Sequence, residues 1–190
     1  MNKAVFIDKD GTLIKDYPYN VDPDLVTYTS SALDALELLY AKGYLIIIIS
    51  NQSGIAKGFF SELDLAILIN KIRHDLSNNN IHLTGFYYCP HYPDSTIQQF
   101  SEQCGCRKPA PGMFHRAAAD HNIDLSASWM IGDILDDMEA GRRAGCKTIL
   151  LNVGNETEWQ LTENRVPDFY ADNLAGAASI ILNDTNTLAR

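Results

Sequence analysis

Apolar runs of strand length alternate along the chain with longer stretches of helical period. "YLIIIIS" at 44–50 is apolar on both faces, which is typical of a central parallel strand covered by helices on each side. "SALDALELLYAKG" at 31–43 starts with serine, repeats apolar residues every three or four positions and ends in glycine, so it predicts a helix. The same criteria predict strands at 3–8, 85–90, 128–133, 147–153 and 167–172. They predict further helices at 61–79, 110–123, 134–145 and 173–184.

This alternation predicts an α/β fold: a doubly wound, mostly parallel sheet with helices on both faces. The chain has 190 residues, a size for which one domain with one substantial core is the simplest arrangement. No repeat, low-complexity tract or linker marks a second unit. We therefore predict a single domain over residues 1–190.

Polar or small residues stand where four of the predicted strands end. The segments are "DKDGT" at 8–12, "SNQSG" at 50–54, "CP" at 89–90 and "GDILDD" at 132–137. In doubly wound sheets, ligands bind in the crevice beyond the carboxyl ends of the strands. We expect these four segments to meet there.

Three of the aspartates at these strand ends suggest a metal site. Asp8 and Asp10 are two residues apart and can point the same way from an extended turn, so they raise each other's pKa or require a cation. Asp133, at another strand end, adds a third hard oxygen ligand, and Mg²⁺ fits such a set best. A single "DGT" is far more often a turn than a site. Its combination with a serine and a lysine near other strand ends makes chance a poor explanation.

Three of the four cysteines and one histidine fall within the segment 89–106, as Cys89-x-His91 and Cys104-x-Cys106. Two tight pairs of soft ligands suit a tetrahedral structural Zn²⁺, and four protein ligands leave no open position for catalysis. A disulfide would need an oxidising compartment. A zinc ribbon that binds nucleic acid would need basic residues, which the intervening positions 92–103 lack. We therefore favour structural zinc over both alternatives.

The charge balance restricts the partners. The net charge is −9, which argues against a nucleic-acid partner because phosphate binding needs a clustered basic surface. No apolar run approaches the roughly 20 residues that cross a bilayer, and the N-terminal apolar patch is too short for a secretory leader. We expect a cytoplasmic protein with no membrane partner. An acidic protein can still bind a phosphate ester locally if a metal or a few cations are placed for it.

The four strand-end motifs resemble those of the haloacid dehalogenase superfamily of phosphohydrolases. "DKDGT", Ser50 after an apolar strand, Lys108 before a helix, and "GDILDD" occur here in the superfamily's order. The resemblance covers the chain from residue 4 to about 153, and the four-part combination is highly specific.

The resemblance implies a role for each of these residues. Asp8 would be the nucleophile that forms an aspartyl-phosphate, and Asp10 would protonate the leaving alcohol and then activate water. Mg²⁺ would be held by Asp8, the backbone carbonyl of Asp10, and Asp133. Ser50 and Lys108 would bind the oxygens of the transferring phosphoryl group.

The cysteine loop directly before "RKP" narrows the resemblance to the phosphatases of D-glycero-D-manno-heptose 1,7-bisphosphate. Histidinol-phosphate phosphatases are close relatives of that branch. The resemblance implies removal of the 7-phosphate, a cytoplasmic step in nucleotide-activated heptose synthesis, by a small enzyme that is a monomer. Histidinol phosphate and other sugar phosphates stay open as substrates. A phosphatase-like fold turned into a binding protein is a third alternative, which the intact motif residues oppose.

The same resemblance implies a substrate pocket. Its residues would be Asp16, Tyr19, Asn51, Gln52, Ser53 and Arg107. Arg107 is the best candidate for the second, non-reacting phosphate or the sugar, because its planar fork bonds two oxygens at once.

Two positions near the end of the motif series leave details open. Ile134 follows Asp133 where related enzymes often place a basic residue, so the sugar phosphate and its anomer are not fixed. Asp137 has two alternative roles, reaching the waters of the metal or orienting Lys108.

Overall fold

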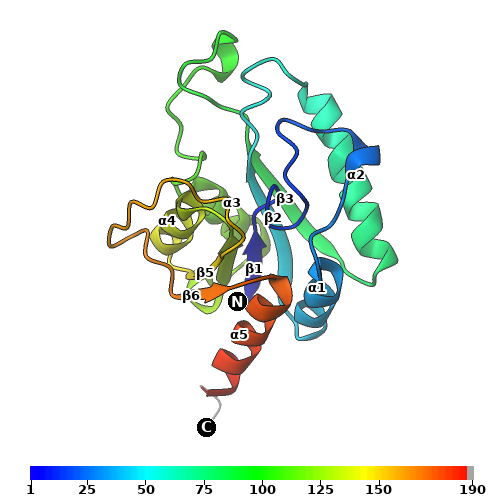
Figure 1. Cartoon of the computed structure of the whole chain (residues 1–190), viewed down its shortest axis with the longest axis vertical. Coiled ribbons are helices and arrows are strands. Elements are labelled where there is room, and N and C mark those ends of the chain that lie inside the picture. The colour runs from blue at the N-terminus through cyan, green and yellow to red at the C-terminus, as the bar shows by residue number, and fades with distance from the viewer. Residues whose placement is uncertain (188–190) are drawn as a thin grey trace.

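A six-stranded parallel sheet forms the centre of the molecule in the computed structural model, which describes residues 1–187, with side chains through residue 184 (Figure 1). The strands are β1 (Ala4–Ile7), β2 (Leu45–Asn51), β3 (Leu83–Cys89), β4 (Trp129–Gly132), β5 (Lys147–Leu151) and β6 (Phe169–Ala171). The α-helices are α1 (Ala32–Ala41), α2 (Glu62–Asn78), α3 (Gly112–His121), α4 (Leu135–Ala144) and α5 (Leu174–Thr187).

The predicted α/β fold is confirmed. Each predicted strand and helix is present, and its ends lie within three residues of the predicted ones. Helix α2 begins as its sequence indicates, because Ser61 and Asp64 form a capping box in which each side chain bonds the other residue's backbone N–H. Among the described helices, none is long and apolar enough to span a membrane.

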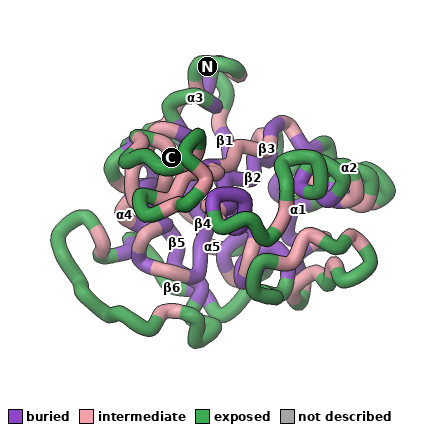
Figure 2. Tube along the Cα trace, turned by 90° about the horizontal axis from the view of Figure 1, so that it is seen from above, coloured by how far each residue is buried: buried purple, intermediate pink, exposed green. Residues whose placement is uncertain are grey.

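Successive residues of the strands face two separate cores. Val5 and Ile7 point into one core, which the sheet shares with α1, α2 and α5. Ala4 and Phe6 point into the other, which it shares with α3 and α4. Strands covered on both faces must be apolar throughout, which explains the unbroken apolar runs of the sequence. Figure 2 shows these buried strands in the middle of the molecule and exposed loops around them.

In the strand order β3-β2-β1-β4-β5-β6, the direction in which successive strands are added to the sheet reverses beside β1. Phe6 in β1 pairs with Ile47 of β2 on one side and with Met130 of β4 on the other. The chain winds outward from β1 in one direction through β2 and β3, and in the other through β4 to β6. Such a switch point opens a crevice beyond the carboxyl ends of the central strands.

Two long connections lie near this edge. Residues 90–111 join β3 to α3 and contain one short 3-10 turn, Gln98–Phe100; they form the green loop at the top of Figure 1. Residues 152–168 join β5 to β6 without a helix or strand, and most of their side chains are exposed.

Candidate functional site

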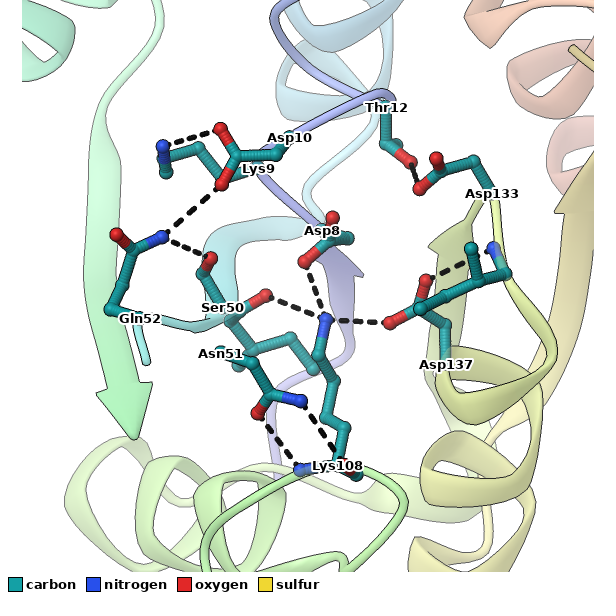
Figure 3. A network of polar contacts seen from close by, with 12 residues as sticks. Asp8, Lys9, Asp10, Thr12, Ser50, Asn51, Gln52, Lys108, Asp133 and Asp137 are labelled. Atoms are coloured by element: carbon teal, nitrogen blue, oxygen red, sulfur yellow. Dashed lines mark hydrogen bonds and ion pairs between the residues drawn. The ribbon is translucent and has the colours of Figure 1, made fainter. Parts of the chain in front are cut away.

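The predicted catalytic residues meet at the switch point, as Figure 3 shows. Asp8 follows β1, Ser50 lies near the end of β2, Asp133 follows β4, and Lys108 comes from the connection before α3. The ammonium group of Lys108 lies between two carboxylates, in ion pairs with Asp8 and with Asp137 of α4, the latter at 2.5 Å. Of the two alternatives for Asp137, the geometry therefore favours orienting Lys108.

Three buried carboxylates share this cluster. One oxygen atom from each of Asp8, Asp133 and Asp137 lies within 4.8 Å of the others. Burial raises the pKa of Asp8 well above its usual range, although Lys108 opposes the shift. Burial and the neighbouring Asp137 raise the pKa of Asp133 to about 6. Burial alone would lower the pKa of Lys108, but Asp137 and Asp8 raise it above its ordinary value.

The charge of the cluster suits a divalent cation. Three ionised carboxylates and one ammonium group leave two negative charges in a buried site, which is costly unless a cation compensates them. The ligand atoms are hard carboxylate oxygens, the type that Mg²⁺ prefers. The residues present therefore fit Mg²⁺.

Hydrogen bonds fix the orientation of Asp133. Its Oδ1 accepts from the hydroxyl of Thr12 at 2.8 Å, and its Oδ2 accepts from the side-chain amide of Asn155 at 2.8 Å. Gly11 has a φ of +79°, and a Cβ built on it would lie 2.2 Å from Oδ2 of Asp133. Only glycine combines that backbone conformation with such a close approach.

Asp10 points away from the carboxylate cluster. Its Oδ1 forms an ion pair with Lys9 at 2.5 Å, and its Oδ2 accepts from the amide of Gln52 at 3.2 Å. The same amide nitrogen donates to the hydroxyl of Ser50 at 2.7 Å, so Gln52 connects the two residues. That the backbone carbonyl of Asp10 binds the metal stays a prediction.

Five of the six predicted substrate residues line one cavity of about 270 Å³. They are Asp16, Tyr19, Asn51, Gln52 and Ser53, and Lys9 and Asp10 line it with them. Arg107 does not line this cavity; its guanidinium carbon lies 5.6 Å from the ring centre of Tyr92. Asn51 also holds the backbone of Lys108, since it accepts from the N–H at 2.9 Å and donates to the carbonyl at 3.1 Å.

The four predicted zinc ligands form a second cluster. The sulfur of Cys106 lies 3.1 Å from that of Cys89, 3.2 Å from that of Cys104 and 3.3 Å from Nδ1 of His91. The sulfurs of Cys89 and Cys104 are 3.4 Å apart, far beyond the ~2.05 Å of a disulfide. All four cysteines of the chain are free. Nearly equal separations among three sulfurs fit one face of a tetrahedron around zinc, where the spacing is ~3.7 Å.

The cysteine–histidine cluster has two further properties that bear on metal binding, a contact of its histidine and the pKa values of its thiols. Nε2 of His91, the ring nitrogen on the other side, lies 3.9 Å from Glu102, as expected of an outer partner that orients a histidine ligand. Burial alone would raise the pKa of the Cys104 thiol, but hydrogen bonds from Cys106 and from the backbone N–H of Arg107 lower it to about 7. Burial raises the pKa of the other two cysteines of the cluster, so a metal must displace their protons as it binds.

Some residues of the site escaped the sequence analysis. Lys9 is buried between the two motif aspartates, and Thr12 is the last residue of the same motif, so "DKDGT" itself carried the signal. Nothing in the sequence marked Asn155 and Glu156 as site residues, because the loop 152–168 has no hydrophobic periodicity and no motif. Glu156 accepts from the backbone N–H of Leu135 at 2.6 Å and thereby caps helix α4.

Parallel strands that end in buried aspartates, with a lysine held between them, define a hydrolase of the haloacid dehalogenase class. Residues 105–177 match the HAD-hydrolase-like family. The chain is 37% identical, over 94% of its own length and 94% of the relative's, to D-glycero-beta-D-manno-heptose-1,7-bisphosphate 7-phosphatase of Salmonella typhi. It is 38% identical to D-glycero-alpha-D-manno-heptose-1,7-bisphosphate 7-phosphatase of Photorhabdus laumondii, over 86% of this chain and 90% of that one. The chain belongs to the family of D-glycero-D-manno-heptose-1,7-bisphosphate 7-phosphatases, which confirms the resemblance inferred from the motifs.

A solved structure supports the same relationship. The D,D-heptose 1,7-bisphosphate phosphatase from B. bronchiseptica, complexed with magnesium and phosphate, aligns with a TM-score of 0.81 at 27% identity. The alignment covers 96% of this chain and 99% of that one. The magnesium of that structure agrees with the metal that the carboxylate cluster here fits.

Proposed function

We propose that this chain is a Mg²⁺-dependent phosphatase that removes the 7-phosphate from D-glycero-D-manno-heptose 1,7-bisphosphate. The observation that carries the proposal is Lys108 held between Asp8 and Asp137 at the switch point, next to a polar cavity. The substrate is inferred from the family to which the chain belongs.

Asp8 is the nucleophile in this proposal. A carboxylate oxygen of Asp8 attacks the phosphorus, the bond from phosphorus to the sugar oxygen breaks, and an aspartyl-phosphate forms. Mg²⁺, held by Asp8, Asp133 and the backbone carbonyl of Asp10, would supply positive charge against the phosphoryl oxygens. Lys108 and Ser50 provide fixed donors for the same oxygens, and these donors need no reorganisation during the reaction.

Asp10 carries the proton in both half-reactions. It donates a proton to the sugar oxygen as that oxygen leaves. It then accepts a proton from the water that attacks the aspartyl-phosphate, and phosphate is released with Asp8 restored. Its carboxylate suits this role because it points to the cavity side, toward Lys9 and Gln52, and not into the carboxylate cluster.

Zinc has a structural role in the proposal. Its four ligands hold the segment 89–106, whose last ligand, Cys106, directly precedes Arg107 and Lys108. The amide of Asn51 holds the backbone of Lys108 from the other side. Lys108 is thus fixed by both the sheet and the zinc loop.

The anomer is the open part of the proposal, since relatives named for the beta and the alpha substrate match at similar identity. The test is kcat/KM for both anomers of the bisphosphate and for histidinol phosphate, with Mg²⁺ present. We expect one heptose anomer to be preferred over histidinol phosphate by at least about tenfold. Better turnover of histidinol phosphate would overturn the substrate assignment. The cytoplasmic location, the single domain and the monomeric state stay predictions.

A further inference from the structure

Two cations gather around one tyrosine of the zinc loop. The ammonium group of Lys57 lies 4.8 Å from the ring centre of Tyr92 and 4.9 Å from that of Tyr19. It also donates a hydrogen bond to the hydroxyl of Tyr19 at 2.6 Å. The guanidinium carbon of Arg107 lies 5.6 Å from the ring centre of Tyr92. Tyr92 is therefore shared by both cations.

Neither cation pairs with a carboxylate within the part of the chain that the structure describes. Nη1 of Arg107 is buried and has no hydrogen-bond partner. A buried guanidinium nitrogen without an acceptor is costly, and an anion beside Arg107 would supply the missing acceptor.

Both cations neighbour residues that line or contact the lining of the substrate cavity, although neither lines it itself. Tyr19 and Ser53 line the cavity, and the backbone N–H of Lys57 donates to the carbonyl of Ser53 at 3.0 Å. Arg107 neighbours Lys108, which reaches Asp8 instead. An anion bound by the two cations would therefore differ from the phosphate that reacts at Asp8.

Tyr19 is itself held in an uncommon conformation. Its φ is +56°, in the left-handed region that few non-glycine residues adopt. Its ring packs against Phe59 with 4.5 Å between the ring centres, and its hydroxyl oxygen accepts from Lys57. Because that oxygen is the acceptor, the hydroxyl hydrogen stays free to donate to a ligand.

We propose that Lys57, together with Arg107, binds the second, non-reacting phosphate of the substrate and so selects a bisphosphate over a monophosphate. This inference rests on the proposed function. Arg107 bonds two phosphate oxygens with its planar fork, and Lys57 adds a compact charge that the aromatic rings of Tyr19 and Tyr92 position. Lys57 is the second positive charge of this subsite, because it and Arg107 lie on the same ring of Tyr92.

The test compares Lys57→Met with the wild type on two substrates, heptose 1,7-bisphosphate and heptose 7-phosphate. We expect kcat/KM for the bisphosphate to fall by about tenfold, mainly through KM, because a hydrogen bond to a charged group is lost. Turnover of the 7-phosphate should change by less than about twofold, since it lacks the second phosphate. Lys57→Arg keeps the positive charge and should retain most of the wild-type preference for the bisphosphate over the 7-phosphate.

The matched control is Lys42→Met, an exposed lysine at the end of α1, ahead of the amino end of β2, which should change neither substrate. Equal losses on both substrates, or no loss on either, would overturn the role of Lys57. If the wild type hydrolyses neither heptose phosphate, the proposed function itself fails and the inference fails with it.

Discussion

The two metal-ligand clusters of this chain are built in opposite ways. The carboxylate cluster is buried, and its three aspartates come from different parts of the fold: two follow β1 and β4, and one lies on α4. The cysteine–histidine cluster is partly exposed, and its ligands come from one segment, 89–106. In the carboxylate cluster the fold brings the ligands together, whereas in the cysteine–histidine cluster the bound metal would hold the chain segment in place.

Because the two clusters are built differently, we expect their metals to have different roles. The carboxylate cluster is already assembled by the strands, and without a cation its like charges oppose folding. The zinc loop has one short 3-10 turn and mostly exposed or half-buried side chains, so a bound metal supplies cohesion that apolar burial does not. Removing Mg²⁺ should therefore stop catalysis and spare the fold, whereas removing zinc should loosen the fold first.

The largest effect is expected from Asp8→Asn. It should lower phosphate release by more than about 10⁴-fold, because an amide cannot form the acyl-phosphate. The melting temperature without Mg²⁺ should stay the same or rise, since a buried carboxylate with a raised pKa has been removed. Phosphate release and thermal melting measure the two effects. The control is Asp24→Asn, an exposed residue of the short 3-10 turn Pro23–Leu25. Turnover within tenfold of the wild type would exclude Asp8 as the nucleophile.

Cys104→Ser tests the cysteine–histidine cluster. Zinc content should fall from about one per chain toward zero, and the melting temperature should drop. We expect kcat/KM to fall by about 100-fold, the effect of displacing a catalytic group such as Lys108 by about 1 Å. Metal analysis, melting and kinetics together check this.

Cys146→Ala is the matched control for zinc content, since Cys146 is buried between the end of α4 and the start of β5 and is not one of the four clustered ligands. It should leave the zinc content unchanged. A zinc-free Cys104→Ser protein with normal stability and kinetics would contradict the coupling between the loop and the site.

The pH dependence of Mg²⁺ binding should show a smaller effect. The pKa of Asp133 is raised to about 6, so without metal the folded state holds this proton more tightly than the unfolded state. That contribution favours folding at low pH and is lost as the pH rises from about 4 through 6. Mg²⁺ needs the ionised carboxylate, so it should bind about tenfold more weakly at pH 5 than at pH 7.

Melting curves of zinc-loaded protein with and without Mg²⁺, from pH 5 to pH 8, measure this. The rise in melting temperature that Mg²⁺ produces should grow with pH and level off above pH 7. An equal rise at pH 5 and pH 8 would contradict the assignment of Asp133 as a ligand.

Asn155→Ala should have the smallest effect. It removes one hydrogen bond to Asp133, worth about 1 kcal/mol, so the affinity for Mg²⁺ should fall about fivefold. Asn152→Ala, an exposed asparagine of the same loop, is the control. Calorimetric titration with Mg²⁺ compares the two, and identical affinities would show that Asn155 does not orient the ligand.

The sequence predicted the sheet and most of the site for a common physical reason. Strands buried on both faces need unbroken apolar runs, and the polar residues that interrupt these runs mark the strand ends where ligands bind. Asp8, Ser50 and Asp133 are such residues. The zinc ligands could be predicted equally well, because all four lie on one segment and their spacing along the sequence already brings them together in pairs.

What escaped prediction depends on contacts between segments without patterns. Asn155 and Glu156 reach the site from a loop whose course is fixed only by tertiary contacts. Lys9 is buried although lysines are usually exposed, because its ammonium group pairs with Asp10 at the cavity. The contact of Lys57 with Tyr92 depends on where the zinc loop folds.

The position of β1 in the sheet has a consequence for how the enzyme acquires its activity. Lys108 reaches back 100 residues to Asp8, and Asp133 bonds Thr12 across 121 residues. Contacts this distant along the chain form late, because the entropy of closing long loops opposes them until both halves of the sheet are in place. A nascent chain that ends before β4 has no second neighbour for β1 and no Asp133. Phosphate release during refolding should therefore lag behind the recovery of helical signal and mark the moment at which the two halves join.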